Sequence, residues 1–160
     1  MKLDAFDRRL LNLVQEDCSL TAEQLSDSVA LSVSAIQRRV RRLHESGVVQ
    51  RSIAVVNVEQ VGRPTFFVVG LEVERERPEL LAQLRRWLAG EAQVQQAFYV
   101  TGEADFILIV TAPDTASYDA LMSRMVSQNP NVRRFTTNVA LGIVKRGLTI
   151  PVPADDLNEH

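Results

Sequence analysis

Cysteine and long apolar runs are scarce in this sequence. Its 160 residues include one cysteine, Cys18, so no disulfide can form within the chain and a disulfide-stapled secreted scaffold is excluded. The longest apolar run, near residues 106–110, is far shorter than the ~20 residues needed to cross a bilayer. The first nine residues, MKLDAFDRR, contain no apolar stretch of the kind found in signal peptides. We therefore expect a cytoplasmic protein that does not enter a membrane.

Residue combinations that support catalysis or metal binding are also missing. His44 and His160 have no cysteine or carboxylate at metal-ligand spacing, so we expect no metal site. The sequence has no Ser/His/Asp set, no GxGxxG and no P-loop. Cys18 is isolated, which favours a small structural residue over a nucleophile. These absences argue against an enzyme, and we expect no catalytic residue and no cofactor.

The charge of the sequence is unevenly distributed. Hydrophobic residues make up 46% and charged residues 24%, enough for a packed core in one ordinary domain or two small ones. The formal net charge is −2, yet residues 32–51 contain five arginines and one glutamate. A basic segment inside an acidic protein is a local electrostatic feature.

Residues 1–50 are predicted to form three short helices. Asp4 can cap the first, and Thr21 with Gln24 fits a capping box for the second. After a short break, Ser32 or Ser34 can cap the third, which Gly47 is placed to end. Two helices joined by a tight break, the second of them basic, are typical of a helix-turn-helix DNA-binding domain.

The outward face of the third helix has the groups that major-groove readout needs. On a helical wheel Ile36, Val40 and Leu43 share one face, and arginine, amide and hydroxyl side chains point away from it. Arginine can reach a guanine edge and glutamine an adenine edge. A solvated basic face of a small bundle is the alternative. Residues 1–51 carry a net charge of only +1, so we expect firm binding to double-stranded DNA to require a dimer.

Individual residues of this helix receive different predicted roles. Residues near a recognition helix N-terminus usually reach bases and later cations contact phosphates. Arg39 lies toward the core side, where it either reaches a phosphate or pairs with an acidic residue of the first two helices. We assign base reading to Ser34, Gln37 and Arg38, backbone contacts to Arg41 and Arg42, and include Ser32 and Arg39 in the predicted DNA-binding set.

Residues 65–152 alternate strand and helix patterns in the order βαββαβ. Strands are predicted at residues 65–74, 94–101, 105–111 and 132–144, with an edge strand at 148–152, and helices begin at Pro78 and Asp114. This order predicts a ferredoxin-like domain, preceded by a β-strand linker at 51–64 and followed by a polar tail at 153–160. Helices on one side leave the other sheet face bare, which predicts a homodimer through the sheets.

The segment YVTGEADF, residues 99–106, is the most informative part of this domain. Gly102 permits a tight turn and close backbone approach, and Glu103 and Asp105 place two carboxylates beside it. Backbone N–H groups and a carboxylate together suit a free α-amino acid. The alternative is an ordinary acidic hairpin in which Asp105 only holds the turn.

Four stretches together resemble the Lrp/AsnC family of transcription regulators. They are LDAFDRRLLNLVQED, LSVSAIQRRVRRLHESGVV, VTGEADFIL and NPNV…NVALGIVKRG, and the resemblance covers roughly residues 2–152. It implies an α+β protein with a winged-helix-like helix-turn-helix domain and a ferredoxin-like domain that senses amino acids. It also implies dimers that often assemble into octamers. By position, the effector site maps onto Tyr99, Thr101, Gly102, Glu103, Asp105, Thr137, Asn138, Val139 and Ala140.

The sequence departs from the family pattern at two informative places. Ala30-Leu31-Ser32 stands where many members have Gly-Leu-Ser, and we expect the turn to be compatible with alanine. Asn138 stands where some members have an aromatic residue, which favours an effector more polar or larger than leucine.

The function that we predict is sequence-specific DNA-binding regulation modulated by a small amino acid. One alternative is an effector-independent architectural regulator with a vestigial pocket. The other is a small amino-acid enzyme or metabolic feedback module with a fused helical domain, against which the missing catalytic set argues.

Overall fold

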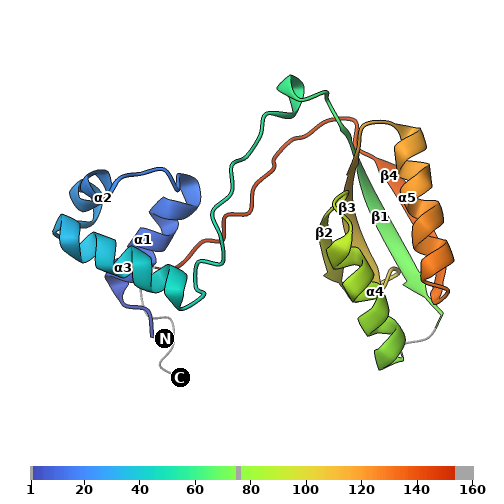
Figure 1. Cartoon of the computed structure of the whole chain (residues 1–160), viewed down its shortest axis with the longest axis horizontal. Coiled ribbons are helices and arrows are strands. Elements are labelled where there is room, and N and C mark those ends of the chain that lie inside the picture. The colour runs from blue at the N-terminus through green and yellow to red at the C-terminus, as the bar shows by residue number, and fades with distance from the viewer. Residues whose placement is uncertain (1, 75–76, 154–160) are drawn as a thin grey trace. The chain divides into compact units, whose positions relative to one another are not determined.

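The computed structural model describes residues 2–74 and 77–153, which form two compact units (Figure 1). Residues 2–55 and 145–153 belong to the first unit, and the described part of 56–144 forms the second. The chain therefore passes between the units twice. None of the described helices is long and apolar enough to cross a membrane.

Three helices make up most of the first unit: α1 (Ala5–Glu16), α2 (Ala22–Val29) and α3 (Val33–Glu45). Each begins at a predicted cap, where the side chains of Asp4, Thr21 and Ser32 accept a hydrogen bond from a first-turn backbone N–H. Of the two candidates for α3, Ser32 is thus the cap. The apolar stripes of the helices meet in a core of Leu10, Leu11, Leu25, Val29, Ile36 and Leu43.

The break between α2 and α3 forces Ala30 into an unfavourable backbone conformation. Ala30 has φ 58° and ψ 45°, the left-handed region that glycine enters without a steric penalty. The expectation of a turn compatible with alanine is therefore wrong, because a left-handed alanine carries a strain cost. Tertiary packing of α2 and α3 therefore overrides the local preference of the residue.

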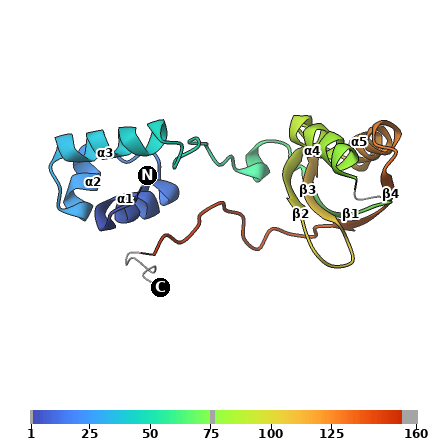
Figure 2. The same ribbon diagram turned by 90° about the horizontal axis from the view of Figure 1, so that it is seen from below.

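The second unit is a four-stranded antiparallel sheet covered by two helices. Its elements are β1 (Thr65–Val73), α4 (Pro78–Gly90), β2 (Val94–Tyr99), β3 (Phe106–Ala112), α5 (Thr115–Gln128) and β4 (Val132–Val139). The strand order is β2-β3-β1-β4, which is the ferredoxin-like arrangement predicted from the sequence. Both helices lie on the same face of the sheet (Figure 2).

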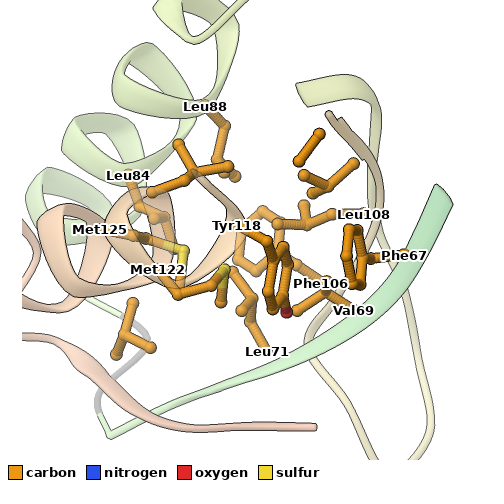
Figure 3. Close-up of a cluster of buried hydrophobic side chains, with 14 residues drawn as sticks. Phe67, Val69, Leu71, Leu84, Leu88, Phe106, Leu108, Tyr118, Met122 and Met125 are labelled. Carbon is orange, nitrogen blue, oxygen red and sulfur yellow. The ribbon is translucent and has the colours of Figure 1, made fainter. Parts of the chain in front are cut away.

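Alternate residues of the strands form the core beneath these helices. Phe67, Val69 and Leu71 of β1 are buried, as are alternate residues of β3 from Phe106 onward. The Tyr118 ring of α5 stacks on Phe67 with a centroid distance of 3.9 Å (Figure 3). The intervening residues of each strand point to the uncovered face.

The connections between the units differ from the prediction of strands. Residues 51–64 contain only a 3₁₀ turn, Val58–Gln60, β4 ends at Val139 rather than at residue 144, and residues 148–152 are irregular. A strand needs a neighbouring strand for its backbone hydrogen bonds, and no strand of the described chain lies beside these segments. Their β-prone residues are exposed instead, among them Val55, Leu141 and Val144.

The returning C-terminal segment binds to the polar side of α1. The Asn12 side chain accepts a hydrogen bond from the Val152 N–H at 3.0 Å and donates to the Val152 carbonyl at 2.9 Å. Gln15, one helical turn later, does the same with Ile150 at 2.8 Å and 3.0 Å. Two amides on one helix face thus satisfy alternate residues of an extended chain, which explains why this segment joins the first unit.

Candidate functional site

The exposed face of α3 is the candidate DNA-binding surface. Ser34, Gln37, Arg38 and Arg41 are all exposed there, while Ile36 and Leu43 are buried behind them. The hydroxyl oxygens of Ser32 and Ser34 lie 3.3 Å apart at the start of the helix. These side chains have the exposure that the predicted contacts with base edges and phosphates require.

Two other arginines of α3 are bound to carboxylates within the same unit. The Arg39 guanidinium contacts Asp4 at 2.6 Å and Asp7 at 2.8 Å. The Arg42 guanidinium donates to both carboxylate oxygens of Asp7, at 2.8 Å and 2.7 Å. Of the two roles considered for Arg39, a phosphate contact or an acidic partner, the structure shows the acidic partner. Arg42, which we assigned to the DNA backbone, also has an acidic partner that the sequence analysis did not identify.

A depression on the uncovered face of the sheet is the candidate effector site. It lies where β1 and β4 pass the β2–β3 turn and has a volume of about 510 Å³. Its lining consists of Val68, Gly70, Glu72, Val100, Thr101, Glu103, Ala104, Ile107, Arg134, Thr136 and Asn138. Apolar and charged side chains are therefore both present around one hollow.

The missing side chain of Gly70 keeps this depression open. A Cβ atom at Gly70 would lie 2.9 Å from Thr136 Oγ1 and 3.3 Å from the Ala104 Cβ. Gly70 and Thr136 are cross-strand partners, and the next pair on the same face is Glu72 with Arg134. The Arg134 guanidinium forms an ion pair with Glu72, so one cation and one anion lie at the edge of the hollow.

The structure brings together some of the predicted effector residues and separates others. Thr101, Glu103 and Asn138 line the depression, and Gly102 lies between the first two with φ 135°. Three others lie on the helix-covered side: Tyr99 beside Phe106, Thr137 bonded through its hydroxyl to Tyr118, and Val139 paired with the buried Phe67. The Ala140 N–H donates to the Phe66 carbonyl just beyond β4.

Asp105 braces the end of the sheet. Its carboxylate accepts a hydrogen bond from the Val73 N–H at 2.7 Å, and its backbone N–H donates to the Leu71 carbonyl at 2.8 Å. Its carbonyl accepts from the Val100 N–H at 2.9 Å. These contacts correspond to the alternative in which Asp105 holds the turn, and it is not among the residues that line the depression.

The sequence analysis missed the β1 and β4 residues at the floor and edge of the hollow. Gly70, Glu72, Arg134 and Thr136 belong to predicted strands, but a pattern of alternation does not say which strands are neighbours. Placing β1 beside β4 in the ferredoxin-like order would have paired these residues. Among the described residues, no group of three or more histidine, cysteine, aspartate or glutamate side chains could hold a metal ion.

Comparisons with known proteins find a matching domain family for each of the two units. A profile for winged helix-turn-helix DNA-binding domains matches residues 3–50, and one for the Lrp/AsnC ligand-binding domain matches residues 67–150. An HTH-type transcriptional regulator of Sinorhizobium fredii is 39% identical over 152 residues, covering 95% of this chain and 90% of the relative. The leucine-responsive regulatory protein of Escherichia coli is 28% identical over 144 residues, covering 90% of this chain and 88% of its own.

Solved structures show the same fold. An AsnC family transcriptional regulator from Agrobacterium tumefaciens superposes with a TM-score of 0.84 at 27% identity, covering 93% of this chain and 97% of the other. A transcriptional regulator from Neisseria meningitidis, solved in complex with L-Met, has a TM-score of 0.83 at 24% identity and covers 94% and 97% of the two chains.

Proposed function

This chain belongs to the Lrp/AsnC family of DNA-binding transcription regulators, and we propose that a small amino acid in the sheet depression modulates its binding to DNA. Its relatives are regulators, which confirms that it is not an enzyme of amino-acid metabolism. As a regulator it acts where the DNA is, in the cytoplasm.

The observation that carries this proposal is the combination of groups around the depression. Arg134, which also pairs with Glu72, offers its guanidinium to an α-carboxylate, and Glu103 offers a carboxylate to an α-ammonium. Val68 and Ile107 supply an apolar wall, and Asn138 supplies an amide. A zwitterionic amino acid matches this set, and the L-Met complex of the Neisseria meningitidis regulator lends support from a protein of the same fold.

The second copy of the chain is part of the same proposal. On the face away from α4 and α5 lie Val68, Ile107 and Ile109, and Phe98 of β2 is 51% exposed. An apolar sheet face without a helix cover is stabilised by the same face of another copy. The resulting homodimer would carry two recognition helices about one DNA turn apart, and further dimers would build an octamer.

The effector would act by preferring one assembly or one DNA-binding arrangement over another. A ligand shifts such an equilibrium only by its difference in affinity for the two states. β4 contributes Arg134, Thr136 and Asn138 to the depression and leads into one of the two connections between the units. The other connection, residues 51–64, leads into β1, which also lines the depression.

A thermal-shift panel of the proteinogenic amino acids tests the proposal. A ligand at 100 times its Kd stabilises the protein by about 2.7 kcal/mol, which is a visible shift. We expect Arg134→Gln to abolish the shift. Arg133→Gln is the matched control, because Arg133 is exposed on the same strand but does not line the depression. No shift with any amino acid would favour an effector-independent architectural regulator.

A further inference from the structure

We propose that Asp4 and Asp7 limit the binding of α3 to DNA phosphates, because they neutralise two of its arginines. Four arginines lie on α3: Arg38, Arg39, Arg41 and Arg42. Two of them, Arg39 and Arg42, are bound to carboxylates of the N-terminal end of α1. This inference needs only DNA binding and does not depend on an effector.

Asp7 is built into the interior as an acceptor for both guanidiniums. Its side chain is 1% exposed, whereas those of Arg39 and Arg42 are 19% and 48% exposed. Its Oδ1 accepts from both arginines, and its Oδ2 accepts from Arg42 and from the Asp4 backbone N–H at 3.2 Å. The carboxylate is thus fully occupied, and a buried carboxylate is stable only when it is paired and hydrogen-bonded in this way.

Asp4 completes the arrangement from the start of α1. Its side chain caps the helix by accepting from the Asp7 N–H at 2.8 Å, and it also contacts Arg39. Partial burial opposes ionisation, but the hydrogen bond from the Asp7 backbone and the Arg39 guanidinium together lower the pKa of Asp4. The Arg39 guanidinium also lies 5.5 Å from the centre of the Phe6 ring, which further fixes it. The lowered pKa keeps the Asp4 carboxyl ionised at neutral pH, and hydrogen bonds fix both carboxylates in place.

Pairing inside the protein changes what α3 offers to DNA. Non-specific affinity comes from cations that replace counterions at phosphates, and a cation already held by a carboxylate contributes less to it. Arg38 and Arg41 are exposed and outside this network. The acidic end of α1 thus weakens sequence-independent binding while the base-reading groups of α3 keep their freedom.

The salt dependence of binding to a mixed-sequence duplex tests this directly. In Asp7→Asn, the released Arg42 should steepen the slope of log K against log salt by about 0.9 per domain. If this contact contributes nothing to the binding constant at about 1 M salt, it raises the binding constant by a factor of about eight at about 0.1 M salt. Asp4→Asn should act in the same direction and keep the helix cap, since asparagine caps as well as aspartate. Affinity for a site selected from random DNA should rise by a similar factor, because a phosphate contact carries no sequence information.

The matched control for charge is Asp27→Asn, which makes the same chemical change at an exposed position of α2. Equal slopes for Asp7→Asn, Asp4→Asn and Asp27→Asn would overturn the proposal, because the effect would then be one of net charge alone. Circular dichroism establishes that each variant is folded.

A second comparison begins from two arginine variants that keep both aspartates. In the otherwise unchanged protein, Arg42→Gln should leave the salt slope on mixed-sequence DNA nearly unchanged, whereas Arg41→Gln should lower it by about 0.9 per domain. Equal losses for the two substitutions would show that Arg42 contacts phosphate despite Asp7, and would overturn the proposal. The double variant Asp7→Asn/Arg42→Gln should return to the wild-type slope.

Discussion

At the scale of single residues, Ala30 is the place where the fold conflicts most clearly with a side chain. The turn between α2 and α3 requires φ 58° there, and a left-handed alanine costs about 1–2 kcal/mol relative to an unstrained residue. We expect Ala30→Gly to raise the free energy of unfolding by about 1 kcal/mol, measured by chemical denaturation. Ala35→Gly, inside α3, should have the opposite sign because glycine weakens a helix by about 1 kcal/mol. Destabilisation by both would contradict this explanation.

Asp4 gives the first unit a defined response to acid. Its pKa in the folded protein is lowered from the ordinary value of 3.8, so the folded state binds fewer protons than the unfolded state as pH falls through that range. The stabilisation is therefore present above about pH 4 and is lost as the pH falls through the lowered pKa. We expect Asp4→Asn to flatten the fall of Tm between neutral and acidic pH. A parallel pH profile for the wild type and the variant would argue against this role of Asp4.

At the scale of elements, the first residue of a helix was predictable wherever a capping residue in the sequence specifies it. Asp4, Thr21 and Asp114 cap their helices as expected because a cap needs only the residue and the backbone a few positions on. The segments 51–64 and 148–152 were wrongly expected to be strands, since β-propensity reports a side chain that fits a sheet and not the presence of a neighbouring strand. Strand formation depends on a partner, which no local signal encodes.

The C-terminal segment on α1 provides a test of one such non-local contact. Four hydrogen bonds join Asn12 and Gln15 to the backbone of Val152 and Ile150. At about 0.5–1.5 kcal/mol each, their loss in Asn12→Ala/Gln15→Ala should speed amide exchange at Ile150 and Val152 by about tenfold or more. Glu16→Ala, an exposed change on the same helix, is the control. Unchanged exchange in the double variant would show that these bonds do not hold the segment.

At the scale of the whole molecule, the candidate site was predictable only in part. The glycine and carboxylates of the β2–β3 turn indicated a candidate site in the sequence, and Thr101 and Glu103 line the depression. Gly70 and Arg134 come from strands that are distant in sequence and meet only when the sheet is assembled. The sequence pattern did not distinguish the two carboxylates of this turn. Asp105 holds the end of the sheet, whereas Glu103 lines the depression.

The uncovered sheet face predicts the association state. We expect the wild-type protein to have the mass of a dimer or a larger assembly by light scattering, because copies cover each other's apolar faces. Val68→Glu, which places a charge on that face, should reduce the mass toward the monomer. Val126→Glu, an exposed position on α5, is the matched control and should not. A monomeric wild-type protein would contradict the sheet-to-sheet dimer.

The most direct test of an amino-acid-responsive regulator is its affinity for a selected DNA site with and without each proteinogenic amino acid. We expect at least one amino acid to change the Kd about fivefold or more, within the usual range of coupling between sites. Arg134→Gln should remove this change, and Arg133→Gln should preserve it. An unchanged Kd with every amino acid, for a protein that binds the site tightly, would contradict the account.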